Sequence, residues 1–116
     1  MQDYELGAWL GDTDTTPEQR TALARISDTL REKRYPGDDG KADAHDAFAS
    51  ATMYVLGDTT LAEVGDAYLQ ARAAEQAAHT RLTGAIIAAA ELGVSESEIS
   101  RQTGVTRVTV RRALGK

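Results

Sequence analysis

Cysteine is absent from this chain of 116 residues, and histidine occurs only twice. Without cysteine there can be no disulfide bond, thiolate metal site or thiol nucleophile. Two histidines, His45 and His79, are too few for a multi-histidine metal centre. We therefore expect neither a metal ion nor a cofactor.

Long apolar runs are also missing, because none approaches the roughly 20 residues that a helix needs to span a bilayer. The first residues, Met1 to Glu5, include two acids, which is unlike a signal or transit peptide. These two features predict a soluble cytoplasmic protein with no membrane partner.

Proline and aromatic residues are scarce, with two Pro and six aromatic side chains, whereas alanine occurs twenty times. Alanine has the highest helix propensity, and proline is the strongest helix breaker. The composition therefore predicts an all-α protein with closely packed helices. Its length suits one ordinary domain, or a small domain with an extended helical arm.

The net charge of −5 is distributed unevenly along the chain. Residues 1–94 contain sixteen acids and eight bases, whereas residues 95–116 contain five bases and two acids. An acidic body with a basic end favours a polyanionic partner for that end.

Two helices are predicted in the acidic part of the chain, and a shorter apolar face precedes them. Thr16 and Pro17 form a helix start, and the helix that follows ends near residues 35–37. This first helix carries an apolar stripe of Leu23, Ile26 and Leu30. A second helix is predicted over about 42–56, with a stripe of Ala44, Phe48, Ala51 and Val55. The apolar face at the start consists of Tyr4, Leu6, Trp9 and Leu10. This face either covers the core of the body, which we favour, or anchors a protein partner.

The longest helical pattern spans about residues 60–92, either as one helix or as two with a break near Gly84 or His79. Its small and apolar residues alternate in steps of three and four. We expect a homodimer contact along this seam, with Glu75 setting the register; the alternative is an internal packing face. The predicted contact residues are Leu61, Val64, Tyr68, Ala71, Glu75 and Ala78, and the seam continues through Leu82, Ala85, Ala89 and Leu92.

Two short helices are predicted after Gly93, joined by a turn at Gly104. Ser95 and Thr60 each precede a Glu by three residues, as in capping boxes. Glycine at 104 permits the positive φ of a tight turn. Ile99 and Val105 bracket the turn, and Ser100 is small where the two helices cross. Val110, Ala113 and Leu114 form the apolar side of the second helix, and Val110 packs back against Ile99 and Val105. This spacing is typical of a helix-turn-helix.

The segment from Ser95 to Leu114 resembles the helix-turn-helix unit of small bacterial regulators and of resolvase and invertase DNA-binding tails. The matching residues are Ile99, Ser100, Gly104, Val105, Thr106, Val110, Arg111, Arg112, Ala113 and Leu114. With a preceding helix at about 81–92, the resemblance covers about a quarter of the chain. It implies a trihelical DNA-binding unit, residues 81–116. Residues 1–80 resemble no family that we can name, and their charge and helical patterns predict an acidic helical body whose long helix leads into this unit.

The resemblance also implies which residues contact DNA. The recognition helix and its start supply Thr106, Arg107, Val108, Thr109, Arg111 and Arg112, and Arg101 and Lys116 add positive charge nearby. Arginines suit phosphates and guanine edges, methyl groups suit thymine, and the cap at Thr106 suits a phosphate. Alternatively, these arginines only solvate a helix end. Two acids, Glu96 and Glu98, would repel phosphate from the preceding helix.

No catalytic arrangement is found, since the His45–Asp46 pair lacks the further ligands of a metal hydrolase, and we expect no enzyme activity. The sequence predicts a sequence-specific double-stranded DNA-binding protein of the nucleoid, acting as a homodimeric transcriptional regulator, a repressor rather than an activator. One alternative is an adaptor or antitoxin-like protein that binds a protein partner through its acidic body. Another is an accessory DNA-organising factor of a mobile element.

Overall fold

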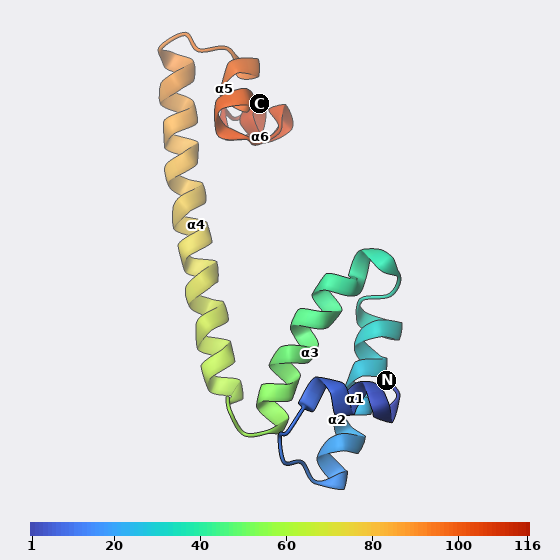
Figure 1. Cartoon of the computed structure of the whole chain (residues 1–116). Helices are drawn as coiled ribbons and strands as arrows, with labels where there is room; N and C mark the ends of the chain where they lie inside the picture. The colour runs from blue at the N-terminus through green and yellow to red at the C-terminus, as the bar shows by residue number, and fades with distance from the viewer. The chain divides into compact units, whose positions relative to one another are not determined.

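The computed structural model describes all residues, 1–116, and every regular element in it is helical. The elements are α1 (Asp3–Leu10), α2 (Pro17–Thr29), η1 (Leu30–Arg34), η2 (Asp38–Gly40), α3 (Lys41–Val55), α4 (Leu61–Glu91), α5 (Glu96–Thr103) and α6 (Arg107–Ala113) (Figure 1). The predicted all-α class is therefore confirmed. Two compact units divide the chain, Met1–Gly65 and Asp66–Lys116, and α4 contributes to both. The division predicted near residue 80 also falls inside α4 and stays a prediction.

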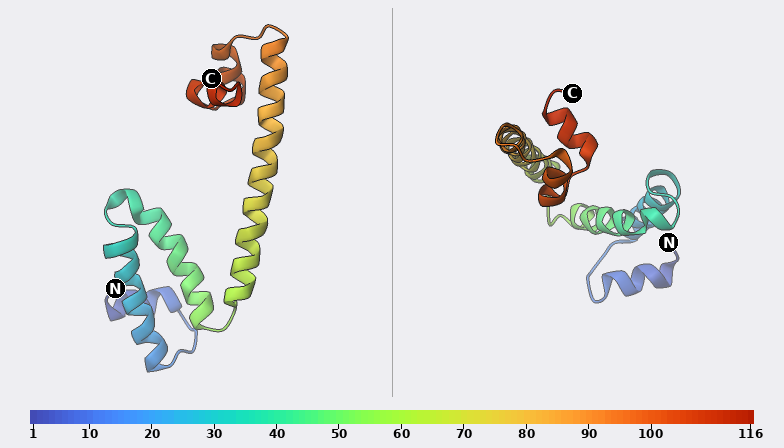
Figure 2. Two further views of the ribbon diagram at one scale, coloured as in Figure 1. Left: turned by 180° about the vertical axis from the view of Figure 1, so that it is seen from behind. Right: turned by 90° about the horizontal axis from the view of Figure 1, so that it is seen from above.

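The first unit packs α1, α2 and α3 around four buried side chains. Leu6 and Leu10 of α1, Leu23 of α2 and Phe48 of α3 form this core. Helices α2 and α3 lie side by side and run in opposite directions, as both views show (Figures 1 and 2). Leu23 and Phe48 lie on the stripes that the sequence predicted, so periodicity alone located the packing faces of both helices.

Helix α1 covers the core of the first unit, which is the interpretation that we favoured. Trp9 is partly buried, packs on Phe48 with ring centroids 5.1 Å apart, and donates a hydrogen bond from Nε1 to Thr52 Oγ1 (3.0 Å). Tyr4 does not join this face, because its side chain is 76% exposed. In an eight-residue helix that packs through Leu6 and Leu10, residue 4 points toward solvent.

The three predicted helix starts at Thr16, Thr60 and Ser95 each have a capping hydrogen bond, but only one of them is a complete capping box. Thr16 Oγ1 accepts from the backbone N of Gln19, and the Gln19 side chain returns a bond, which completes a box at α2. At α4 and α5 only the first half is present. Thr60 and Ser95 accept from the backbone N of Glu63 and Glu98, but neither carboxylate returns a bond to the cap residue. The Glu63 side chain instead accepts from the Thr59 hydroxyl, and that of Glu98 binds groups on α5.

After Thr29 the chain continues as a π-helical turn, η1, and then turns sharply into α3. Gly37 has a φ of +78°, a conformation that glycine adopts without steric cost. Gly40 lets the backbone approach Tyr35, because a Cβ at this position would lie 2.6 Å from the Tyr35 carbonyl carbon. The connection between α2 and α3 therefore depends on two glycines.

Helix α4 is a single helix of 31 residues with no break at Gly84 or His79. Every residue from 61 to 80 is exposed. The predicted seam does not continue as expected beyond this segment. Ile86 is buried, whereas Ala85 is exposed and Leu92 is 86% exposed. A straight helix with 3.6 residues per turn presents residues 82, 86, 89 and 90 on one face, rather than the 3.5-residue seam that we predicted.

The second unit packs the end of α4 against α5 and α6. Ile86, Ile99 and Val110, one from each helix, form its buried core. Half-buried apolar residues surround them, namely Leu82, Ala89, Ala90, Val94, Val105, Ala113 and Leu114. None of the helices in the chain combines the length and apolar character needed to cross a membrane.

The contact at Gly40 gives a test of the first unit. Gly40→Ala should lower the free energy of unfolding by about 1–3 kcal/mol, because the new methyl group overlaps the backbone of Tyr35. Thermal unfolding followed by the fluorescence of Trp9, the only Trp, measures it.

Gly65→Ala is the matched control. A Cβ at Gly65 meets nothing within 4 Å, and alanine should stabilise this helix by about 0.5–1 kcal/mol. Equal effects of the two substitutions would contradict the close approach at Gly40.

Candidate nucleic-acid interface

Helix α6 follows α5 after a short turn at residues 104–106. Gly104 ends α5 with a φ of +79°, and Thr106 caps α6 by accepting from the backbone N of Thr109 (3.2 Å). Ser100 Oγ donates to the carbonyl oxygen of Val105 (2.6 Å), which ties α5 to the turn. The small residue expected at the crossing of the helices therefore also supplies a hydrogen bond.

The faces of α6 divide as the periodicity predicted. Val110 is fully buried and Ala113 and Leu114 are half-buried, whereas the other side of the helix faces solvent. Of the predicted contact residues, the exposed ones are Thr106, Arg107, Val108, Arg111 and Arg112. Thr109 is half-buried, and its hydroxyl lies 3.0 Å from that of Thr106. Its methyl group is therefore less open than the sequence suggested.

Glu96 binds two of the predicted basic residues. Arg111 Nη1 lies 3.2 Å from Glu96 Oε1, and Lys116 Nζ lies 2.8 Å from Glu96 Oε2. The hydrogen bond from Lys116 is the main cause that lowers the pKa of Glu96, with Arg111 adding to it against partial desolvation. Glu96 therefore stays ionised and neutralises positive charge on this side of α6.

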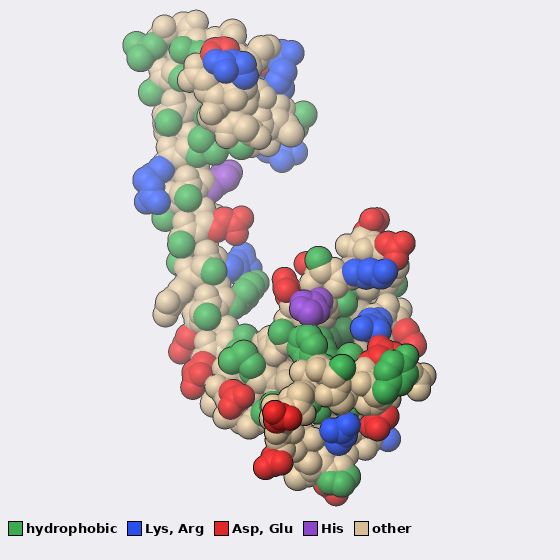
Figure 3. Space-filling model, viewed as in Figure 1, with side chains coloured by type: hydrophobic (Ala, Val, Ile, Leu, Met, Phe, Trp, Pro, Cys, Tyr) green, Lys and Arg blue, Asp and Glu red, His purple; other side chains and the backbone are tan.

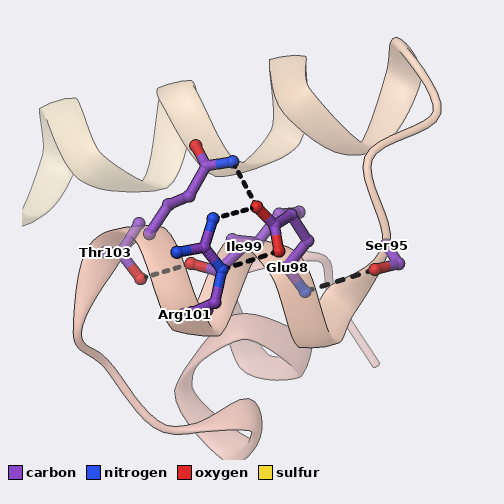
Figure 4. Close-up of polar contacts among 6 residues, drawn as sticks. Ser95, Glu98, Ile99, Arg101 and Thr103 are labelled. Carbon is purple, nitrogen blue, oxygen red and sulfur yellow. Dashed lines mark hydrogen bonds and ion pairs between the residues drawn. The ribbon is translucent and has the colours of Figure 1, made fainter.

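Glu98 binds a third predicted basic residue, Arg101, which lies on the same helix, α5 (Figure 4). The Arg101 guanidinium donates through Nε (2.8 Å) and Nη2 to the two carboxylate oxygens, and Gln102 Nε2 donates to Oε1 (2.8 Å). Mainly because of Arg101, the pKa of Glu98 falls to about 2, and the pKa of Arg101 rises. Arg101 is therefore already occupied by a carboxylate.

Arg107 and Arg112 are the two basic residues after Ser95 that form no ion pair. They lie on the exposed side of α6, with Val108, which is 62% exposed. Lys and Arg side chains are visible around α5 and α6 in Figure 3. No acid occupies the first turn of α6. Of the five bases among the eight predicted contact residues, Arg107 and Arg112 are therefore the two without an ion pair.

The sequence reasoning did not predict that the two acids bind three of the bases. Glu98 and Arg101 are three residues apart on one helix, a spacing that brings side chains together, so this pair was detectable. The contact of Glu96 with Arg111 and Lys116 joins residues 15 and 20 positions apart and depends on how α6 packs.

The remaining candidate residues lie elsewhere. All six predicted dimer residues, Leu61, Val64, Tyr68, Ala71, Glu75 and Ala78, are exposed on α4. His45 packs edge-on against Trp9, with ring centroids 5.2 Å apart, and no three metal-ligating side chains come together.

No known family model matches this chain, and no curated protein sequence or solved structure is significantly similar to it.

The Glu98–Arg101 pair predicts a pH dependence. In Arg101→Gln the pKa of Glu98 should rise from about 2 toward its ordinary value of 4.5, as followed by the carboxyl carbon in an NMR titration. Because the folded-state pKa is the lower one, the pair stabilises the fold above about pH 4.5, and this contribution is lost as the pH falls toward 2.

The matched control is Arg107→Gln, which removes an arginine that forms no ion pair. It should leave the pKa of Glu98 at its low value. If Arg101→Gln also leaves the pKa of Glu98 unchanged, Arg101 is not the cause of the low pKa.

Proposed function

We propose that this protein binds double-stranded DNA through α6 and acts as a homodimeric transcriptional regulator. The observation that carries the proposal is that Arg107 and Arg112 lie exposed on α6 without a carboxylate partner, beside exposed Val108. Guanidinium groups bind phosphates or the O6 and N7 edge of guanine, and a valine methyl packs against the methyl of thymine. The resemblance of residues 95–114 to the helix-turn-helix unit of bacterial regulators is a second support, since two short helices, α5 and α6, span this segment.

One such unit is too small for specific binding. Two free arginines neutralise few phosphates, and non-specific affinities at physiological salt are in the range of ~10⁻⁴ to 10⁻⁶ M. A homodimer places two units on one duplex, with half-sites about one helical turn or a multiple of it apart. The partner copy would therefore supply the missing affinity.

The exposed part of α4 supports the homodimer. In proteins, most of the stability of a helix comes from packing of its apolar face against other elements. Residues 61–80 are all exposed and include large apolar side chains, with Leu61 at 73% and Tyr68 at 57%. A second copy that covers this face would bury the apolar side chains.

An antiparallel pairing fits this face better than a parallel one. Around a centre between residues 69 and 70, Leu61 faces Ala78 of the second copy and Tyr68 faces Ala71. In this register Val64 faces Glu75, so two of the three pairs join a large side chain to a small one. A parallel pairing would place Glu75 against Glu75 in the contact, with repulsion between like charges. Residues 61–70 carry two acids and no base, whereas residues 71–81 carry two bases and one acid, so the antiparallel arrangement also pairs opposite charges.

Repression is the simpler activity for such a dimer, because blocking a promoter requires only binding. The protein would then act in the cytoplasm at the nucleoid. The first unit contains thirteen acids and six bases, and we expect it to face away from DNA. Two alternatives remain. If the protein does not bind DNA, it is an adaptor or antitoxin-like protein that binds a protein partner through the first unit. If it binds DNA without base preference, it is an accessory DNA-organising factor of a mobile element.

Substitution of the free arginines tests DNA binding. Arg112→Ala and Arg107→Ala should each cost about 1–3 kcal/mol and relax base preference where the arginine reads a base. An arginine that touches phosphate only should give a uniform loss and a salt slope lower by about one. Selection from a random duplex pool at about 0.15 M salt supplies the site, and fluorescence anisotropy measures the affinity.

Two further variants act as controls in the same assay. Arg101→Ala removes an arginine that Glu98 already binds, so its effect should be smaller. Glu96→Gln should strengthen binding, because it removes a negative charge and releases Arg111 and Lys116. If Arg107→Ala and Arg112→Ala bind the selected duplex as the parent does, α6 is not the interface.

The dimer is tested without DNA. Ala71→Glu should convert the dimer to a monomer in sedimentation equilibrium, because it places a charge opposite Tyr68 of the second copy. Gln70→Glu adds the same charge at an exposed neighbouring position off the seam and should leave the dimer intact.

The orientation is tested by cysteine cross-linking, which is clean because the chain has no Cys. A mixture of Leu61→Cys and Ala78→Cys should cross-link, whereas either variant alone should not. Cross-linking of Leu61→Cys by itself would mean a parallel pair.

A further inference from the structure

The first unit contains a cavity of about 630 Å³ that the proposed DNA interface does not use. Its walls come from α1, α2, η1, the turn before α3 and α3 itself. The volume lies within the range of small-molecule sites. Because all of its lining residues belong to one unit, the cavity forms within the packing of residues 1–65.

One side of the cavity is aromatic. Trp9, His45 and Phe48 line it, and their rings contact one another, with centroids 5.1 Å apart for Trp9 and Phe48 and 5.2 Å for Trp9 and His45. The hydrogen bond from Trp9 Nε1 to Thr52 holds the indole in place. A fixed aromatic wall favours a flat, unsaturated ligand that packs against it in a stacked or edge-on manner.

A serine also lines the cavity. Ser27 is only 2% exposed and belongs to α2. A serine hydroxyl can both donate and accept a hydrogen bond. Ser27 can therefore offer a hydrogen bond to a ligand in the cavity.

The charge of the lining is opposite to that of the unit around it. In a unit with thirteen acids and six bases, Arg31 and Lys41 line the cavity together with a single acid, Asp38. Their ion pairs are weak, because Arg31 lies 3.9 Å from Glu5 and the Lys41–Asp38 pair (3.3 Å) is almost fully exposed. Both cations are therefore available to an anionic group.

The backbone of this wall is unusual in a way that suits a binding site. Arg31 lies in the π-helical turn η1, and such turns are rare and occur frequently at functional sites. The adjoining turn depends on Gly37 and Gly40, as described above. This segment carries Arg31 and Tyr35 into the lining of the cavity.

We propose that this cavity binds a small aromatic carboxylate, with a ring the size of benzoate. The ring packs against Trp9 and Phe48, the carboxylate binds Arg31 and Lys41, and Ser27 donates a hydrogen bond to a polar substituent or to the carboxylate. This site is independent of DNA binding, and its occupation is measured on the full chain in the absence of DNA.

The test uses benzoate as the probe, with isothermal titration calorimetry and the indole N–H signal of Trp9 in NMR as readouts. Benzoate should bind with saturation and shift the Trp9 signal. Benzamide keeps the ring without the charge, and cyclohexanecarboxylate keeps the charge without the aromatic ring. Each should bind about tenfold more weakly. Equal binding of all three, or no shift of Trp9 at millimolar benzoate, would overturn the proposal.

Variants assign the contacts. Arg31→Gln should weaken benzoate binding about tenfold, since a charged hydrogen-bond donor is lost. Ser27→Ala should weaken it severalfold. Arg25→Gln is the matched control, because Arg25 is an exposed arginine on α2, the helix that precedes η1, and does not line the cavity. Unchanged unfolding temperatures verify the folds, and equal loss in Arg31→Gln and Arg25→Gln would mean that binding is only non-specific charge attraction.

Discussion

Only eight apolar side chains are buried in this chain, five in the first unit and three in the second, and half-buried apolar residues pack around them. In the second unit, each of α4, α5 and α6 supplies a single buried residue. Short helices such as α5 and α6 are marginal in water by themselves. Their existence, and with it the exposed face of α6, therefore depends on the contact of Ile86 with Ile99 and Val110.

A core of this size leaves most polar side chains near the surface, where ion pairs decide which charges remain available. Three of the five bases after Ser95 bind Glu96 or Glu98. The proposed DNA contact consequently depends on Arg107 and Arg112. The same two acids that oppose binding to phosphate hold Arg101, Arg111 and Lys116 in place on the second unit, so charge and packing are coupled there.

The two units differ in how they would reach a partner. In the second unit the free cations lie on a convex helix face, which suits a polyanion such as DNA. In the first unit the cations line a cavity with aromatic walls, which suits a small anion. On the exposed segment of α4, the predicted seam carries large apolar side chains in its first half and mainly small ones in its second half, which suits another helix. Three surfaces of different chemistry therefore share one short chain.

The sequence by itself determined the helical class, the helix starts at Thr16, Ser95 and Thr106, and the inward residues Leu23, Phe48, Ile99 and Val110. Local rules suffice for these features, because caps and helical periodicity act over a few residues. Only the tertiary structure decided that Ile86 rather than Ala85 is buried, that Glu96 binds Arg111 and Lys116, and that Trp9 and Ser27 line a cavity. Each of these depends on how helices distant in sequence pack together, and residue spacing carries no record of that.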